Sequence, residues 1–216
     1  RRKMILHVMR HELLLFAREP RFWIPFFLPP ALLFASQAIL LSFPLNAELT
    51  GQMLLLTGIL MAPMSSPLAA DSFAGERERG SLELLCLSPV RPADLFWGKF
   101  FAVLPFPVIF ALCAQCAYAL LFPQVTFVLF WKASLASVSF ALWMTGLSLL
   151  VSLSAKTVRS ATQVSLFLVL PLILFAQWGS DRYFASNLLP ALLPLGVLAF
   201  LALCACAGLR KFRRNF

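Results

Sequence analysis

The chain has 216 residues, of which 61% are hydrophobic and only 12% are charged. Soluble domains carry about 25% charged residues, so this composition excludes an ordinary soluble enzyme or binding module. The net charge of +9 would suit a nucleic-acid partner. The basic residues, however, gather in the segments that separate long apolar stretches, and we therefore expect no nucleic acid to bind.

The first segment, residues 1–21, is basic and amphipathic. Its apolar residues recur at three- and four-residue steps, with basic residues on another side. This pattern predicts an interfacial helix on a membrane surface, and the absence of a small-residue cleavage site argues against a cleavable signal. His7 and His11 lie four residues apart, but such a pair on a basic face usually faces water, so we expect no metal site.

Six stretches of the chain contain no Asp, Glu, Lys or Arg, and the shortest has 21 residues. They are 22–47, 49–70, 100–131, 133–155, 160–180 and 183–209. About 20 apolar residues cross a bilayer as a helix, and a helix satisfies its own backbone in lipid. The sequence therefore predicts an all-α integral membrane protein with six transmembrane helices, built as a single domain over residues 1–216.

The distribution of positive charge predicts the orientation. If the N-terminus is cytoplasmic, 16 of the 18 Lys and Arg residues lie on the cytoplasmic side, and only Lys132 and Arg182 lie outside. This asymmetry is the positive-inside pattern. Because the number of spans is even, both termini are expected in the cytoplasm.

No Asp, Glu, Lys, Arg or His lies within the six stretches, which argues against a proton relay or an ion-coupled carrier. Mid-span polar side chains are few, and they are the candidates for lining a transport pathway. These candidates are Gln37, Gln115, Thr145 and Gln163. Trp143 is also mid-span, and we expect it to pack against a neighbouring helix.

Prolines are frequent in the apolar stretches and predict kinked or broken helices. The last stretch is longer than one span needs, and Pro190 and Pro194 interrupt its first half. These features predict a short re-entrant segment at 179–194, before the sixth span.

The one polar concentration lies at 72–95, between the second and third spans. Gly80 and Ser81 can end one helix and start another, and the residues that follow are apolar until Pro89. A short apolar helix held at the inner membrane face is suited to dock into a groove on another protein. A solvated loop whose leucines lie on the bilayer fits the same residues.

This segment resembles the cytoplasmic loop of ABC-2 type transporter permeases. It reads Glu76-Arg77-Glu78-Arg79-Gly80-Ser81-Leu82-Glu83, then Ser88-Pro89-Val90 and Gly98-Lys99. A second resemblance, to the family's entry into its fifth span, runs from Ser154-Ala155-Lys156 to Leu170-Pro171-Leu172. With the interfacial helix and the six spans, the resemblance covers essentially the whole chain.

In that family the loop couples the membrane subunit to a separate ATPase, and two membrane subunits line the path. The resemblance implies the permease of an ATP-driven exporter in the bacterial inner membrane, surrounded by lipid. Its implied partners are an ABC ATPase subunit and a second copy or sister permease, with residues 72–91 as the coupling element. The implied coupling residues are Glu76, Arg77, Glu78, Arg79, Gly80, Ser81, Leu82, Glu83, Leu84 and Leu85.

The chain itself shows no ATP site. Gly75 and Gly80 have the spacing of a phosphate-binding loop, but Ser81 and Leu82 stand where Lys and Ser or Thr are needed. We therefore expect no catalytic residue and no cofactor in this chain, with ATP and Mg²⁺ bound by the partner.

Two alternatives stay open on the sequence. A haem-export permease of cytochrome c maturation has similar length, six spans and a related Gly-Ser-Leu-Glu loop. A membrane scaffold that recruits a cytoplasmic protein without transport would also show few polar residues in its spans.

Overall fold

The computed structural model describes residue 35 and residues 47–81, 92–186 and 188–215. These residues form helices joined by short turns, with no strand among them. In chain order the elements are α3 (Ala47–Ile59), a 3₁₀ turn (Ala62–Met64), α4 (Ser65–Ala70), a π-helical turn (Asp71–Gly75), α5 (Glu76–Glu78), α7 (Pro92–Val103), α8 (Pro105–Leu121), α9 (Phe127–Ser154), α10 (Val158–Ala185) and α11 (Leu188–Asn215). The all-α prediction is confirmed for this part of the chain.

Four helical segments of the described residues are long and apolar enough to cross a membrane. They are Leu49–Glu78, Ala93–Leu121, Phe127–Ser154 and Leu188–Gly208. The first, called here the central rod, runs from α3 through α4 to α5 without a loop. α10 follows the fifth uncharged stretch as one helix of 28 residues. The predicted interfacial helix and nearly all of the first predicted span lie outside the described residues.

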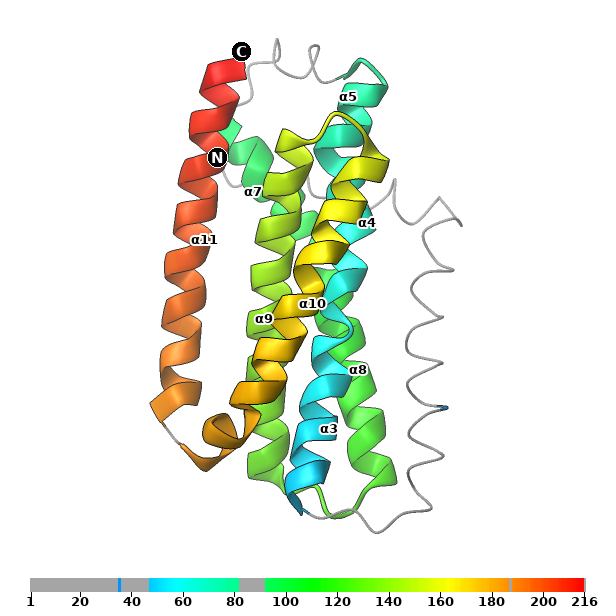
Figure 1. Ribbon diagram of the computed structural model, residues 1–216, viewed down its shortest axis with the longest axis vertical. Coiled ribbons are helices and arrows are strands. Elements are labelled where there is room, and N and C mark those ends of the chain that lie inside the picture. Colours follow the sequence, from blue (N-terminus) through cyan, green and yellow to red (C-terminus); the bar gives the residue numbers. More distant parts are fainter. Residues whose placement is uncertain (1–34, 36–46, 82–91, 187, 216) are drawn as a thin grey trace.

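Helix α9 lies at the centre of the bundle and packs against α3, α4, α8, α10 and α11 (Figure 1). The most apolar part of the central rod is 72% buried and that of α9 is 56% buried, against 22% for α11. The central rod and α9 therefore form the core, and α11 lies at the edge. The end of α5, the α9–α10 connection and the C-terminal end of α11 lie at the same end of the bundle (Figure 1), which is called here the α5 end.

A stripe of small residues on α9 explains its central place. The stripe repeats at three- and four-residue steps and consists of Ser134, Ser137, Ala141, Thr145, Ser148 and Ser152, all buried. Small side chains let helix backbones approach closely and can donate hydrogen bonds across the contact. The Ser148 hydroxyl, for example, lies 3.3 Å from that of Ser66 in the central rod.

The closest approach lies at Gly58 of the central rod. A Cβ at this position would stand 2.0 Å from Ser137 Oγ and 2.3 Å from Gln115 Nε2. Gly58→Ala should lower the free energy of unfolding by about 1–3 kcal/mol, because a packed interior must shift to admit the methyl group. Thermal unfolding in detergent measures this. Gly196→Ala is the matched control, since its Cβ meets nothing within 4 Å, and equal stability of the two variants would contradict the prediction.

One predicted span boundary is wrong. The uncharged stretches place it at Lys132, whereas α8 ends at Leu121 and α9 begins at Phe127. Pro123 lies in the intervening turn, where it cannot continue α8. Lys132 lies inside α9, and its Nζ donates to Phe184 O at 2.9 Å and to Ser186 O at 3.0 Å. A lysine near a helix end can reach polar groups in this way, so its charge marks no boundary.

The described part of the predicted re-entrant segment is divided between α10 and α11, and these residues show no separate hairpin. Pro190 lies among the first four residues of α11, whose backbone N–H groups have no partner within the helix, so the proline removes no bond there. Pro194 lies inside the same helix. The last part of α10 bends away from the axis of the helix before the chain enters α11 (Figure 1).

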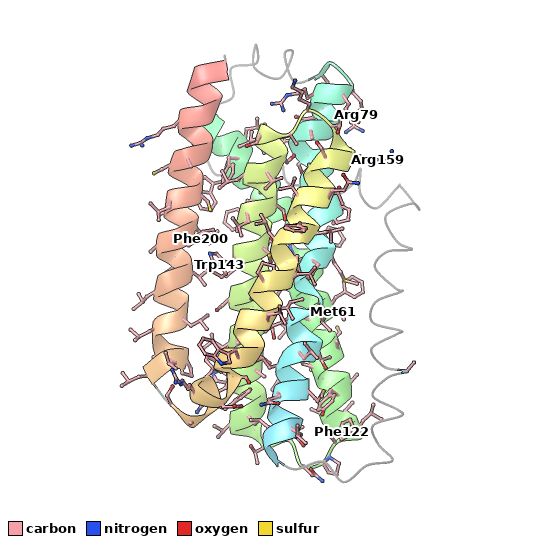
Figure 2. All side chains as sticks on the ribbon, in the orientation of Figure 1. Met61, Arg79, Phe122, Trp143, Arg159 and Phe200 are labelled. Carbon is pink, nitrogen blue, oxygen red and sulfur yellow. The ribbon has the colours of Figure 1, made fainter. Side chains whose placement is uncertain are left out.

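Trp143 packs as expected. Its ring meets that of Phe200 edge to face, with the ring centroids 5.0 Å apart and an interplanar angle of 79°. Figure 2 shows the two side chains facing each other between α9 and α11. The prediction of helix packing at this position is confirmed.

Candidate functional site

The predicted coupling motif begins as part of the central rod. Residues 71–78 are helical, so the polar segment continues the span instead of opening into a loop at residue 72. Gly80 ends the helix with a φ of 68°, and its N–H donates to Arg77 O at 3.1 Å. The Ser81 hydroxyl donates to Glu76 O at 3.2 Å. These bonds satisfy carbonyls that a helix end leaves open.

Glu76 faces the interior of the bundle. Its Oε1 accepts a hydrogen bond from Lys99 Nζ of α7 at 2.7 Å, and the Lys99 side chain is only 1% exposed. The same amine donates to Ser72 O at 2.7 Å and lies 5.1 Å from the centre of the Phe73 ring. A charge is buried at this depth only when paired and hydrogen-bonded, so this ion pair joins α7 firmly to the central rod.

The next two residues reach the connection between α9 and α10. The Arg77 guanidinium donates to Ala155 O and, at 3.1 Å, to Leu153 O. The Glu78 carboxylate accepts a hydrogen bond from Val158 N, the first residue of α10, at 2.9 Å. A carboxylate is favoured at a helix N-terminus because the backbone N–H groups there are unpaired and carry partial positive charge.

Arg79 folds back along its own helix. Its Nη2 lies 3.1 Å from Asp71 Oδ2, and its side chain is 60% exposed. Gly75 makes room for this pair, because a Cβ there would stand 2.1 Å from Asp71 Oδ1. Arg79 and Glu78 are both exposed, and Arg79 lies at the α5 end of the bundle (Figure 2).

Ser152 of α9 inserts its hydroxyl into the backbone of the central rod. It donates to Ala70 O at 2.8 Å and accepts from Phe73 N at 3.2 Å and from Ala74 N at 3.0 Å. A hydroxyl has one donor and two acceptor sites, so all of its capacity is used. The insertion coincides with the π-helical turn at Asp71–Gly75, and such turns arise where a side chain enters the helix ladder.

The predicted coupling residues are thus only partly brought together by the described structure. Glu76, Arg77, Glu78 and Arg79 form one cluster with Gly80 and Ser81, whereas Leu82, Glu83, Leu84 and Leu85 lie outside the described residues. Three of the four charged side chains are bonded to other elements of the same chain. Lys99, which holds Glu76, was quoted in the motif without an assigned role. Ser152, which holds the backbone of the central rod, had no assigned role either, although the serine repeat on α9 was visible in the sequence.

The three predicted pathway residues that the structure describes do not share one surface. Gln115 is fully buried on α8 and donates to Ser137 Oγ at 2.8 Å and to Leu54 O at 3.3 Å. Thr145 is buried and donates to Ala141 O of its own helix. Gln163 is exposed on α10, and Gln37 lies outside the described residues. Among the described residues no group of three or more His, Cys, Asp or Glu could hold a metal ion.

The sequence matches the family model of the ABC-2 type transporter over residues 4–177. The chain belongs to the ABC-2 type transporter family. A curated relative, the ABC transporter permease protein NatB of Bacillus subtilis (strain 168), is 33% identical over 138 residues. That alignment covers 55% of this chain and 34% of the relative, so the chain spans about a third of the length of the relative it matches.

Family membership and the apolar helices together show a multi-pass membrane protein. The family is a membrane component of transport and is not itself catalytic. Members of this family normally work with an ATPase subunit.

Proposed function

We propose that this chain is the permease subunit of an ATP-driven exporter in the bacterial inner membrane. Two permease chains form the translocation pathway, and an ATPase subunit that binds ATP and Mg²⁺ docks through residues 72–91. Family membership and the NatB likeness support a permease, and the bonded network at Glu76–Arg79 supports the docking position.

The observation that carries this proposal is the fastening of the motif to three other elements. Glu76 bonds to Lys99 of α7, Arg77 to the end of α9 with the connection that follows, and Glu78 to the start of α10. A push on the end of the central rod is therefore transmitted to α7, α9 and α10 together. Alternating access needs this kind of rigid-body motion, because packed interfaces switch between discrete arrangements instead of deforming smoothly.

The network also assigns different roles to the charged residues of the motif. Glu76 and Glu78 serve inside the permease, where they transmit motion between helices. Arg79, whose side chain is 60% exposed, and the residues that follow Ser81 are assigned to the contact with the ATPase. We place this end in the cytoplasm, since Arg77, Arg79, Lys156, Arg159 and Arg210 all lie in the elements that meet there.

Purification of the chain in mild detergent with its partners tests the proposal. We expect an ABC ATPase to copurify, and we expect ATP-dependent efflux when the complex is reconstituted in vesicles. ATP-independent flux, or a complex that contains no ATPase, would contradict it. Recruitment of a cytoplasmic protein without any flux would favour the scaffold alternative.

Gly80→Ala should separate ATP hydrolysis from transport. The φ of 68° costs an L-residue about 1–2 kcal/mol, and a Cβ at this position meets nothing within 4 Å. The chain should therefore fold but present the following residues at a changed angle. The measurement is cargo moved per ATP hydrolysed in vesicles. Gly179→Ala, at a helical glycine with equal free space, is the control, and an unchanged ratio in Gly80→Ala would contradict the prediction.

A further inference from the structure

A cavity of about 890 Å³ lies between α3, α9, α10 and α11, away from the charged site. Aromatic side chains dominate its wall: Phe140 and Trp143 from α9, Trp178 and Tyr183 from α10, and Phe200 from α11. Volumes of 300–1,000 Å³ with mostly apolar walls and a few polar groups are typical of ligand sites. The proposed coupling function uses none of these side chains.

Arg182 supplies the one cationic group of this wall. It is exposed in the last turn of α10, and its guanidinium makes no hydrogen bond or ion pair within the described part of the chain. The neighbouring carboxylate, Asp181, is engaged elsewhere: its Oδ1 accepts from Gln52 Nε2 of α3 at 2.6 Å. The guanidinium is therefore free to meet an anion at the cavity.

The surface around this cavity is apolar. Large apolar side chains are exposed on both helices that flank it, namely Phe167, Leu170, Leu174 and Trp178 of α10 and Leu189, Leu192, Leu195 and Leu198 of α11. In a membrane-spanning helix such side chains face acyl chains. Trp178, which is 80% exposed, lies four residues before Arg182, and tryptophan prefers the level of the lipid headgroups.

We propose that this cavity binds a membrane phospholipid with an anionic headgroup. An acyl chain of the lipid lies between α10 and α11 against Phe140, Trp143 and Phe200. Its phosphate meets the guanidinium of Arg182, whose planar fork suits bidentate contacts with phosphate oxygens. The lipid thereby fills the space between the edge helix α11 and the core of the bundle. This inference does not rest on the proposed transport function, because it concerns lipid bound in the absence of ATP and of any ATPase.

The test is a titration of the full chain, delipidated in detergent, with phosphatidylglycerol or with phosphatidylcholine of the same acyl chains. Native mass spectrometry counts the bound lipids. We expect phosphatidylglycerol to bind about fivefold more tightly, which is the effect of one basic residue near an anionic headgroup. Inorganic phosphate at the same concentration should not compete, because it lacks the acyl chain.

Two sets of substitutions distinguish the contribution of the lipid headgroup to binding from that of the acyl chain. Arg182→Gln should reduce the fivefold preference to none. The double substitution of Gly179→Leu and Gly196→Leu should weaken the binding of both lipids, because both glycines line the cavity. A Cβ on either glycine meets nothing within 4 Å, so the leucine side chains have room to occupy the space of the acyl chain. Leucine also raises helix propensity at these positions, so the variant should fold.

Matched controls exist on the same helices. Arg159→Gln removes an exposed arginine from the other end of α10, and Ala202→Leu adds bulk to an exposed position of α11 outside the cavity. Both should bind lipid as the parent chain does. Equal affinity for the two lipids in the parent chain, an unchanged preference in Arg182→Gln, or a dimer in which a second copy closes the cavity and excludes lipid would each overturn the proposal.

Discussion

Ser152→Ala is expected to lower the free energy of unfolding strongly, although it removes only one hydroxyl group. Loss of the hydroxyl removes three hydrogen bonds, to Ala70 O, Phe73 N and Ala74 N. A buried backbone group left unsatisfied costs about 1–3 kcal/mol. The variant should therefore lose several kcal/mol of unfolding free energy, or the central rod should rewind into a regular α-helix.

Rewinding would itself damage function. Closing the bond from Ala74 N to Ala70 O removes the extra residue of the π-helical turn, which rotates the chain beyond it by about 100°. Glu76 would then leave Lys99, and Glu78 would leave the start of α10. Either outcome predicts a lower midpoint of thermal unfolding in detergent and a lower transport rate per ATP in vesicles.

Ser134→Ala is the matched control for this experiment. Ser134 lies on the same small-residue stripe of α9 and is buried, but its hydroxyl has no hydrogen-bond partner among the described residues. Its removal should therefore leave stability unchanged or slightly raised. If Ser152→Ala unfolds and transports as Ser134→Ala does, the inserted hydroxyl has no structural role and the argument fails.

The second large effect is expected at the buried ion pair. Lys99→Met leaves Glu76 without its amine, and Glu76→Gln leaves the Lys99 amine with a neutral partner. Breaking a buried pair by removing one charge costs about 3–5 kcal/mol, because the other charge stays in the interior. Each single variant should fall near the lower end of that range, since the Glu76 side chain is 17% exposed. Thermal unfolding measures the loss, and the double variant should recover much of it.

A second ion pair, at the same end of the central rod, provides the comparison. Arg79 and Asp71 are 3.1 Å apart, but the Arg79 side chain is 60% exposed. Exposed pairs contribute about 0–1 kcal/mol, so Arg79→Gln should barely change stability while it changes ATPase binding if this residue is a docking contact. Equal losses of stability at the two ion pairs would show that burial does not determine how much each pair contributes.

Much of the architecture was predictable because lipid imposes a simple code. Stretches without charge must be helical, and each of the four described spans contains most of one such stretch. The spans depart from the stretches at 71–78 and 93–99, where charged residues continue a helix, and at Lys132, which reaches the carbonyls of Phe184 and Ser186. The error at Lys132 has a definite cause: a charged side chain with a long apolar stem can lie inside a helix, so its charge does not mark the end of a span.

The candidate site was only half predictable. The Glu-Arg-Glu-Arg-Gly-Ser run marked the position, because a charged turn beside a membrane span is conspicuous in an apolar chain. The partners of that run are distant in sequence: Lys99 lies 23 residues from Glu76, and Val158 lies 80 residues from Glu78. No local pattern reports such pairs, so charged groups expected at a docking face prove to bind within the chain.

The chain's composition and charge placement by themselves determined a helical membrane protein with a polar segment between two of its spans. These features depend on transfer between water and lipid, which each residue undergoes independently of its distant neighbours. Only the tertiary structure decided that the segment continues the central rod, that Ser152 opens its backbone, and that α11 stands beside a cavity at the edge. Those features depend on which side chains come into contact when the helices pack. These contacts join residues that are distant in sequence, so the arrangement of the whole bundle determines them.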